Sequence, residues 1–261
     1  MSFAKKSLGQ NYLIDNNIIK KIISTVTIKN RDIIEIGPGK GALTEEILIK
    51  EPKSLLIIEK DLKLYEKLKE KYFNNNKVKI FNADILKFNI EEVVKSDSCI
   101  FGNLPYNISS QILIKIIKFK KWPPKFKDIV FMFQKELGEK IIGKYSSSNY
   151  GRLSIISNYR LKIQKKFLVS ANCFFPKPKV TSMVIHAQPK KNNLYEIKNL
   201  NSLEKITNIL FSSKRKMINK NIFKLLDYSK INEIPGINLK SRPLEIKPDI
   251  YYKIAELYEG I

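Results

Sequence analysis

The sequence predicts an α/β fold in which a mostly parallel, seven-stranded sheet has helices on both faces and is followed by a small helical domain. Two observations support this prediction. Short runs of β-branched residues alternate with stretches whose apolar residues recur at helical spacing, which is typical of a parallel sheet. Beyond Pro189 only the helical spacing remains, so we place a domain boundary there and expect domains 1–189 and 190–261.

The first half of the expected sheet alternates regularly between helix and strand. Asp15 can cap a helix that extends to about Val26. Further helices are expected from about Ala42 and from Leu62, because apolar residues there share one helical face. The expected strands are 32–36, 54–58, 78–81 and 99–101.

The second half of the sheet is less regular. Helices are expected at 112–119 and 136–142, around a strand at 129–133. The loop 144–149 contains three consecutive serines and is expected to be mobile. The last two strands, 161–169 and 180–187, are joined by the proline-rich segment 174–178.

The composition excludes several classes of protein. No apolar run approaches the roughly 18 residues of a membrane span, and the start of the chain lacks a signal-peptide pattern. Cys99 and Cys173 form no CxxC motif, which fits a reducing compartment, so we expect a cytoplasmic protein. His186 is the only histidine and lies in a strand pattern, so we expect a structural role for it and no metal site.

The chain is strongly basic, with 48 Lys and Arg residues against 25 Asp and Glu residues. Few of the basic residues are Arg, so a nucleotide bias of the genome is one explanation. The distribution favours another, because no acidic residue lies between Glu139 and Glu196 or in the stretch 212–226. Such a one-sided excess is typical of a surface that binds a polyanion, and nucleic acid is the expected partner.

A glycine-rich loop follows the first expected strand, with the sequence Glu35-Ile36-Gly37-Pro38-Gly39-Lys40-Gly41. A dinucleotide fingerprint would need a third glycine at position 42, where this chain has Ala42. The GxGxG spacing behind an acid is instead the pattern of S-adenosylmethionine-dependent methyltransferases. Glu59 and Asp84 end the next two strands, where carboxylates can accept hydrogen bonds from a ribose and an adenine amino group. An acid at Glu59 also suits NAD, so a dehydrogenase remains an alternative.

The loop after the fourth expected strand, Asn103-Leu104-Pro105-Tyr106, resembles the loop of amino-methyltransferases that act on adenine N6. The lone pair of such an amine is delocalised into the ring, which makes it a poor nucleophile. Asn103 and a main-chain carbonyl of Leu104 or Pro105 can each accept one of its N–H groups and aim the lone pair at the methyl donor. Tyr106 offers a ring face on which the base can stack.

Over nearly its full length the chain resembles the ribosomal RNA adenine N6-dimethyltransferases of the bacterial KsgA type. That family has the class I, Rossmann-like methyltransferase fold. The stretches that carry the resemblance are Ser7–Leu13, Glu35–Gly41, Asn82–Asp84, Phe101–Ser109, Gln134–Glu136, Tyr150–Ser154, Phe174–Val180 and Phe211–Lys216.

The resemblance implies a role for individual residues. Phe174 matches the aromatic residue that sandwiches a flipped adenine against Tyr106. The chain departs from the family pattern at Lys177, where a proline is usual, and Tyr12 stands where Phe is commoner. The residues implied to bind the cofactor are Asn11, Leu13, Gly37, Gly39, Glu59, Asp84 and Asn103, and the expected RNA-binding residues are Lys214, Arg215, Lys216 and Lys220.

By this resemblance the chain is expected to be a monomeric enzyme that binds the small ribosomal subunit and no membrane. It would dimethylate N6 of two adjacent adenines near the 3′ end of the small-subunit RNA and release S-adenosylhomocysteine. One alternative is the related large-subunit enzyme that confers macrolide resistance, which usually has Ser-Gln-Asn where this chain has Gly9-Gln10-Asn11. Another is a non-catalytic RNA-binding relative.

Overall fold

The computed structural model describes residues 11–260. Residues 1–10, which contain the first four residues of the Ser7–Leu13 motif, and Ile261 lie outside the described part. The chain forms two compact units. One comprises residues up to 138 together with 162–189, and the other comprises 139–161 together with 190–261.

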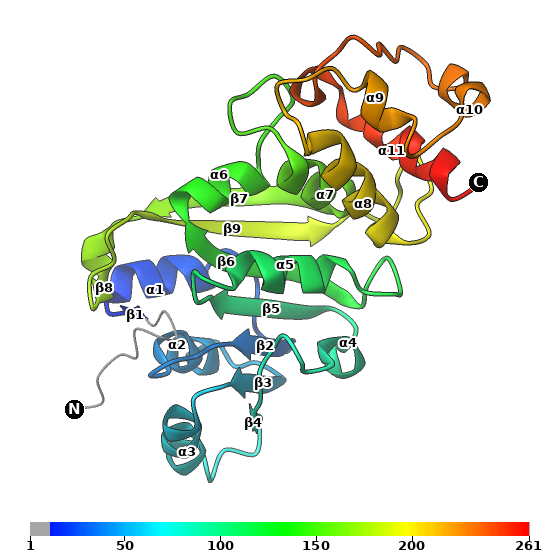
Figure 1. Ribbon diagram of the computed structural model, residues 1–261. Coiled ribbons are helices and arrows are strands. Elements are labelled where there is room, and N and C mark those ends of the chain that lie inside the picture. The colour runs from blue at the N-terminus through cyan, green and yellow to red at the C-terminus, as the bar shows by residue number, and fades with distance from the viewer. Residues whose placement is uncertain (1–10, 261) are drawn as a thin grey trace. The chain divides into compact units, whose positions relative to one another are not determined.

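The first unit is built on a seven-stranded sheet with the order β4-β3-β2-β5-β6-β9-β7 (Figure 1). The pairs from β4 to β6 are parallel, and β9 runs antiparallel to β6. The predicted mostly parallel sheet is therefore confirmed. The strands are β2 Asp32–Ile36, β3 Ser54–Glu59, β4 Val78–Asn82, β5 Ser98–Asn103, β6 Phe126–Gln134, β7 Leu161–Val169 and β9 Ser182–Pro189.

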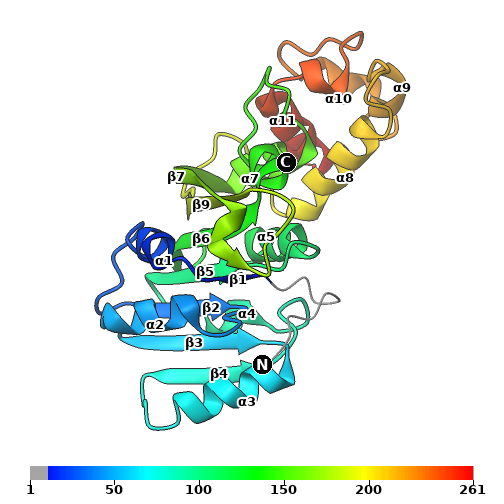
Figure 2. The same cartoon turned by 90° about the vertical axis from the view of Figure 1, so that its left-hand side faces the viewer.

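Helices cover both faces of this sheet, because successive side chains of a buried strand point to opposite faces. Ile33, Ile57 and Phe101 share one face with the apolar side of α1 (Asn16–Ile23) and α2 (Ala42–Ile49). On the other side lie α4 (Ile90–Val93) and α5 (Ser109–Ile117), as Figure 2 shows. The unit also contains α3 (Leu62–Lys71).

The first helix begins where the sequence predicts and ends earlier. Asp15 is its N-cap, and Oδ1 accepts hydrogen bonds from the backbone N–H groups of Asn17 (2.9 Å) and Ile18 (3.0 Å). The helix ends at Ile23, three residues before the predicted end. Thr25 donates its hydroxyl to the carbonyl of Ile22 at 2.7 Å, so a polar side chain takes up one of the last helical carbonyls.

A second, two-stranded sheet joins distant parts of the chain. β1 (Tyr12–Leu13) pairs antiparallel with β8 (Phe174–Phe175), and the 3₁₀ turn Ala171–Cys173 precedes β8. Tyr12 lies opposite Phe175, and Leu13 lies opposite Phe174. The sequence predicted only a loop over 174–178, because a two-residue strand leaves no periodic pattern.

The second unit is helical, as predicted, but it also includes residues 139–161. Buried tyrosine hydroxyls tie this segment to the tail: Tyr150 donates to the carbonyl of Ile246 at 2.8 Å and Tyr252 donates to that of Ile155 at 3.0 Å. The predicted boundary after residue 189 is thus one of several crossings between the units. Its helices are α7 Arg152–Arg160, α8 Leu200–Phe211, α9 Asn219–Ile222, α10 Tyr228–Asn232 and α11 Pro248–Tyr258, and α6 (Lys135–Ile141) spans the first crossing.

Candidate cofactor and target site

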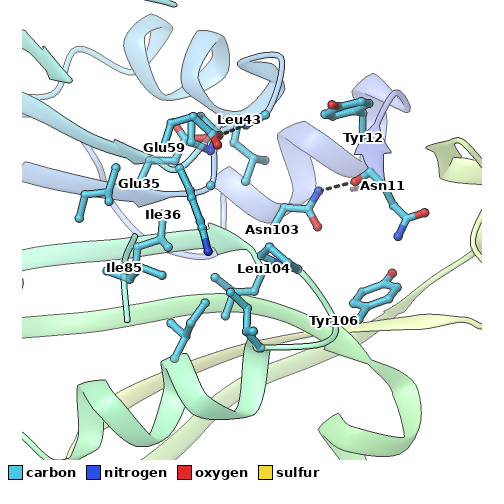
Figure 3. A pocket seen from close by; sticks show the side chains of 18 of the residues that line it. Asn11, Tyr12, Glu35, Ile36, Leu43, Glu59, Ile85, Asn103, Leu104 and Tyr106 are labelled. Carbon is cyan, nitrogen blue, oxygen red and sulfur yellow. Dashed lines mark hydrogen bonds between the residues drawn. The ribbon is translucent and has the colours of Figure 1, made fainter. Parts of the chain in front are cut away.

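The carboxyl ends of four neighbouring strands form one pocket in the first unit (Figure 3). In sheet order, β4 is followed by Asp84, β3 ends at Glu59, β2 leads into the glycine-rich loop and β5 ends at Asn103. The chain passes from β2 outward to β4 and then returns to the other side of β2 at β5. The pocket therefore lies at the switch point of the sheet, where ligands of such folds bind.

The glycine-rich loop requires glycine for conformational and steric reasons. Gly37, Gly39 and Gly41 all have positive φ angles, of 67°, 62° and 90°. A Cβ atom on Gly39 would lie 2.9 Å from Cδ1 of Tyr12, the residue that covers the loop from β1. The loop therefore presents bare backbone to the pocket, where a ligand can approach closely.

Glu59 is held at the pocket by two backbone N–H groups. Its Oε1 accepts from Asp61 at 2.7 Å, and its Oε2 accepts from Gly39 at 3.3 Å. The side chain is buried, and this burial raises the pKa of its carboxyl. The two bonds leave acceptor positions on both oxygens, as the binding of a pair of hydroxyl groups requires.

Asp84 lies beside Glu59 and is oriented by two donors. Lys60 pairs with Oδ2 at 2.9 Å, and the backbone N–H of Leu86 donates to Oδ1 at 3.0 Å. The hydrogen bond from Lys60 is the main reason that the pKa of Asp84 is lowered. Asp84 is therefore an ionised acceptor at neutral pH.

Glu35 is a buried acid behind the glycine-rich loop, and it also lines the pocket. Thr44 donates its hydroxyl to Oε2 at 2.6 Å, whereas Oε1 has no hydrogen-bond partner within residues 11–260. Burial raises the pKa of Glu35 to about 8, so most of this carboxyl is protonated at neutral pH. A buried polar atom without a partner at the wall of a pocket is suited to contact a ligand.

The side-chain amide of Asn103 has a defined orientation. Its Nδ2 donates to the main-chain carbonyl of Asn11 at 3.0 Å, as Figure 3 shows. Because the amide nitrogen of Asn103 is used in this bond within the protein, Oδ1 is left as an acceptor on the pocket side. Gly37 lies directly beside this loop, since a Cβ on it would be 3.9 Å from the Asn103 carbonyl oxygen.

In the rest of the Asn103 loop, the main-chain carbonyls of Leu104 and Pro105 differ in whether the protein already binds them. The carbonyl of Pro105 already accepts from the backbone N–H of Ile108 at 3.1 Å. Within the described residues, no hydrogen bond reaches the carbonyl of Leu104, which lines the pocket. Tyr106 also lines the pocket and is half-buried, with its hydroxyl 2.6 Å from Oγ of Ser182.

The structure brings together every predicted cofactor residue and four of the five predicted catalytic residues. Sequence reasoning did not single out the apolar walls or Lys40, and no local pattern indicates them. The predicted residues that line the pocket are Asn11, Leu13, Gly37, Gly39, Glu59, Asp84, Asn103, Leu104, Pro105 and Tyr106, and further lining residues include Leu43, Ile58, Ile85 and Ile112.

Phe174 is the exception among the predicted catalytic residues. Its side chain is 3% exposed and packs in the core that α1 and α2 share with the sheet, and it does not line the pocket. Phe175, the next residue, is 64% exposed. A base could stack on Phe174 only if the ring left this core, and the role of Phe174 in target binding stays a prediction.

The basic residues Lys214, Arg215, Lys216 and Lys220 lie in the second unit, between the end of α8 and the start of α9. All four are exposed. Within the described part of the chain none of them forms an ion pair with an acidic side chain. Their role in RNA binding stays a prediction.

The chemistry of the pocket lining fits S-adenosylmethionine. The bare glycine backbone, the carboxylates of Glu59 and Asp84 and the unpartnered oxygen of Glu35 match a cofactor with hydroxyl, amino and ammonium groups. Residues 11–260 contain no group of three or more His, Cys, Asp or Glu side chains that could hold a metal ion. In the same range, no helix is long and apolar enough to cross a membrane.

His186, the single histidine, lies outside the pocket on β9. Its Nε2 is 2.7 Å from Oδ1 of Asp128, and the same oxygen accepts from Nε2 of Gln188 at 2.8 Å. Oδ2 of Asp128 pairs with Arg31 at 2.8 Å. These donors offset the burial of Asp128 and lower the pKa of its carboxyl to about 2. This buried network ties β6 to β9, which agrees with the structural role predicted for the histidine.

Comparison with known proteins gives consistent matches over the whole chain. The model of a family described as ribosomal RNA adenine dimethylase matches residues 1–259. A protein of Pelagibacter ubique (strain HTCC1062) named ribosomal RNA small subunit methyltransferase A is 44% identical, over 99% of this chain and 98% of the relative. A protein of the same name from Malacoplasma penetrans (strain HF-2) is 39% identical, over 97% of this chain and 91% of the relative.

Solved structures show the same fold. A dimethyladenosine transferase from Plasmodium falciparum matches with a TM-score of 0.76 at 25% identity, over 95% of this chain and 97% of that one. The 23S rRNA methyltransferase ErmE matches with a TM-score of 0.69 at 21% identity, over 95% of this chain and all of that one. The class I methyltransferase fold predicted from the sequence is confirmed.

Proposed function

This chain belongs to the ribosomal RNA adenine dimethylase family, and from that premise we propose that it methylates small-subunit ribosomal RNA. The enzyme transfers methyl groups from S-adenosylmethionine to N6 of two adjacent adenines near the 3′ end of that RNA during ribosome biogenesis. Each adenine receives two methyl groups and becomes N6,N6-dimethyladenine. At each transfer the bond from sulfur to the methyl group breaks as the bond to N6 forms, the nitrogen loses one proton, and one S-adenosylhomocysteine is released.

The orientation of the Asn103 amide is the observation that supports this chemistry most directly. Its nitrogen is bound to the carbonyl of Asn11, so its oxygen is free to accept an N–H group of the target amine. The carbonyl of Leu104 can accept the second N–H, because it accepts no hydrogen bond from the described residues, whereas that of Pro105 already accepts one from Ile108. Two acceptors at one amine draw its nitrogen toward a tetrahedral geometry and aim its lone pair.

The same loop suits an adenine that has left the RNA stack. N6 of a stacked base lies too far inside a helix to reach a pocket at the sheet edge, so the base must flip out. The ring of Tyr106 can return part of the unstacking energy, since such stacking contributes roughly 1–3 kcal/mol per base. The reaction needs no imidazole, because an amine positioned in this way attacks without a strong general base.

The residues of the first three strand ends hold the cofactor. Glu59 accepts the ribose hydroxyls, Asp84 accepts the adenine amino group, and the loop from Gly37 to Gly39 lies along the methionine part. Asn11 and Leu13 cover the cofactor from β1. When bound there, S-adenosylmethionine supplies an electrophilic methyl group on sulfur, beside the Asn103 loop.

The partner is the small ribosomal subunit or an assembly intermediate of it, and the enzyme acts as a monomer in the cytoplasm. The exposed residues Lys214, Arg215, Lys216 and Lys220 contact the phosphate backbone. The names of the relatives favour the small subunit over the large-subunit alternative. All of the predicted cofactor residues, together with Asn103 and Tyr106, line the pocket, which argues against a non-catalytic RNA-binding relative.

Methylation of isolated subunits tests this proposal. Small and large subunits that lack the modification are incubated with the protein and labelled S-adenosylmethionine, and the modified bases are then mapped. We expect two adjacent dimethylated adenines near the 3′ end of the small-subunit RNA and no label in the large subunit. Label confined to the large subunit, or no transfer although the cofactor binds, would contradict the proposal.

A further inference from the structure

Tyr106 is held at both ends by serine hydroxyls. Its phenolic oxygen lies 2.6 Å from Oγ of Ser182, and its main-chain carbonyl accepts from Oγ of Ser109 at 3.1 Å. Both serines are fully buried, at 0% exposure. A tyrosine at the mouth of a pocket would otherwise be free to rotate about its side-chain bonds.

The topology of the sheet explains why Ser182 can reach this tyrosine from 76 residues away. β9 runs antiparallel to β6, so its first residue lies at the edge where the parallel strands end. Ser182 pairs there with Gln134, the last residue of β6. The backbone N–H of Lys135 donates to the carbonyl of Thr181 at 2.9 Å, which continues the pairing past the strand.

Ser182 does not line the pocket, and its hydroxyl lies within hydrogen-bond distance of Tyr106, which does line it, so Tyr106 connects Ser182 to a ligand. Among the described residues that line the pocket, Tyr106 is the aromatic side chain on the loop that carries Asn103. The hydrogen bond fixes where the phenolic end of the ring lies. Because the O–H and the lone pair of a phenol prefer the plane of the ring, the direction of the bond also favours one tilt of the ring face. A ring face that is already held in this way loses less rotational freedom when a base stacks on it.

We propose that Ser182 is a positioning residue for the methyl-transfer reaction, because its hydroxyl holds the Tyr106 ring in the orientation that receives the target adenine. This inference rests on the proposed function. It gives β9, a strand whose end does not form the pocket, a role in positioning the target base. The proposed contacts to the ribose, the adenine and the methionine part of the cofactor lie at the ends of β3, β4 and β2, and β9 is not a neighbour of any of these strands.

A double-mutant cycle tests the inference. Ser182→Ala and Tyr106→Phe each remove one partner of the same hydrogen bond, and the double variant removes both. In single-turnover methylation of small subunits at saturating S-adenosylmethionine, we expect each single variant to be roughly 3- to 10-fold slower, the scale for one lost hydrogen bond. The double variant should be no slower than the slower single variant, and calorimetry should give all three the cofactor affinity of the parent.

Two further variants separate positioning from folding. Ser98 is also fully buried and its hydroxyl donates to the carbonyl of Lys95, at the opposite end of β5. Ser98→Ala should therefore transfer methyl groups at the parent rate, and Ser182→Thr, which keeps the hydroxyl, should recover most of the loss. If Ser182→Ala does not fold, Tyr106→Phe must still show the loss, because it breaks the same bond from the other side.

The outcomes distinguish this inference from the proposed function. If the parent protein does not methylate small subunits, the proposed function fails. If the parent is active but Ser182→Ala transfers at its rate, or if the two single losses multiply in the double variant, only the positioning role of Ser182 is overturned.

Discussion

Asn103 is the single residue on which the proposed chemistry depends most, because in that proposal its amide oxygen accepts an N–H group of the target amine. We expect Asn103→Ala to lower the single-turnover rate of methyl transfer by about 10²-fold or more, the scale for losing one catalytic polar contact. The affinity for S-adenosylmethionine, measured by calorimetry, should stay within a few-fold, since Glu59 and Asp84 are untouched. Equal turnover by the variant and the parent would remove Asn103 from the mechanism.

Glu35 makes stability depend on pH through its burial. The pKa of Glu35 rises from 4.5 to about 8 on folding, so the folded protein keeps a proton that the unfolded chain releases at lower pH. The contribution of Glu35 to the free energy of unfolding therefore falls as pH rises from about 5 to about 8, and is constant above that range.

Glu35→Gln replaces the protonated acid by a neutral group of the same shape. We expect a smaller pH dependence of stability in denaturant unfolding, with the variant more stable than the parent at about pH 8 and similar to it at about pH 5. Glu46→Gln on α2, where the carboxylate pairs with Lys50 at 3.4 Å, controls for the loss of one carboxyl group. An unchanged pH slope in Glu35→Gln would show that the folded state does not retain this proton.

At the scale of elements, the short pair of β1 and β8 connects Tyr12, which covers the glycine-rich loop, to the core. Leu13 and Phe174 lie opposite each other and point into the core, while Tyr12 covers Gly39 from the other side of β1. The ring of Phe174 therefore contributes to the order of the segment that closes the pocket.

Phe174→Ala should lower the free energy of unfolding by about 3–5 kcal/mol, the usual loss for a buried phenylalanine ring. The more conservative Phe174→Leu keeps most of the apolar volume but removes the ring, so it tests the predicted stacking of the target adenine separately. Single-turnover methylation is measured with thermal melting alongside. If Phe174→Leu keeps the melting temperature of the parent but transfers methyl groups more slowly, the stacking role is supported. If it transfers at the parent rate, Phe174 has a role only in the core.

At the scale of the whole molecule, the net charge of +23 is expected to favour binding of RNA, and the question is whether one cluster of basic residues contributes more than the others. Replacing Lys214, Arg215 and Lys216 by Ala should weaken RNA binding and reduce the slope of log affinity against log salt by up to about three phosphate contacts. The affinity for S-adenosylmethionine should not change, because none of the three lines the pocket.

A matched variant controls for the change in net charge. Lys63, Lys67 and Lys69 are exposed on α3, and replacing them by Ala removes the same charge from the first unit. We expect this control to reduce the salt slope less. An equal reduction in both variants would mean that binding follows the overall charge and that the basic cluster has no special role.

Local sequence patterns were sufficient to predict most strands of the sheet. The strand 32–36 was predicted with its observed bounds, because a buried parallel strand is a continuous β-branched run between polar turns. Helix α7 was not predicted, since three of its buried positions are Ser154, Ser157 and Arg160, which give no apolar period. The segment around it was therefore assigned to the first domain, although its tyrosines pack with the tail.

The types of residue at the candidate site and their place at strand ends follow from the chain alone, because spacing and strand order determine which ends can meet. The partners that orient those residues depend on contacts over long separations: Asn103 with Asn11 over 92 residues, and Tyr106 with Ser182 over 76. The burial of Phe174 opposite Leu13 is of the same kind. A hydrogen bond or a core contact between distant segments leaves no periodic signal in either segment, so only the folded arrangement specifies it.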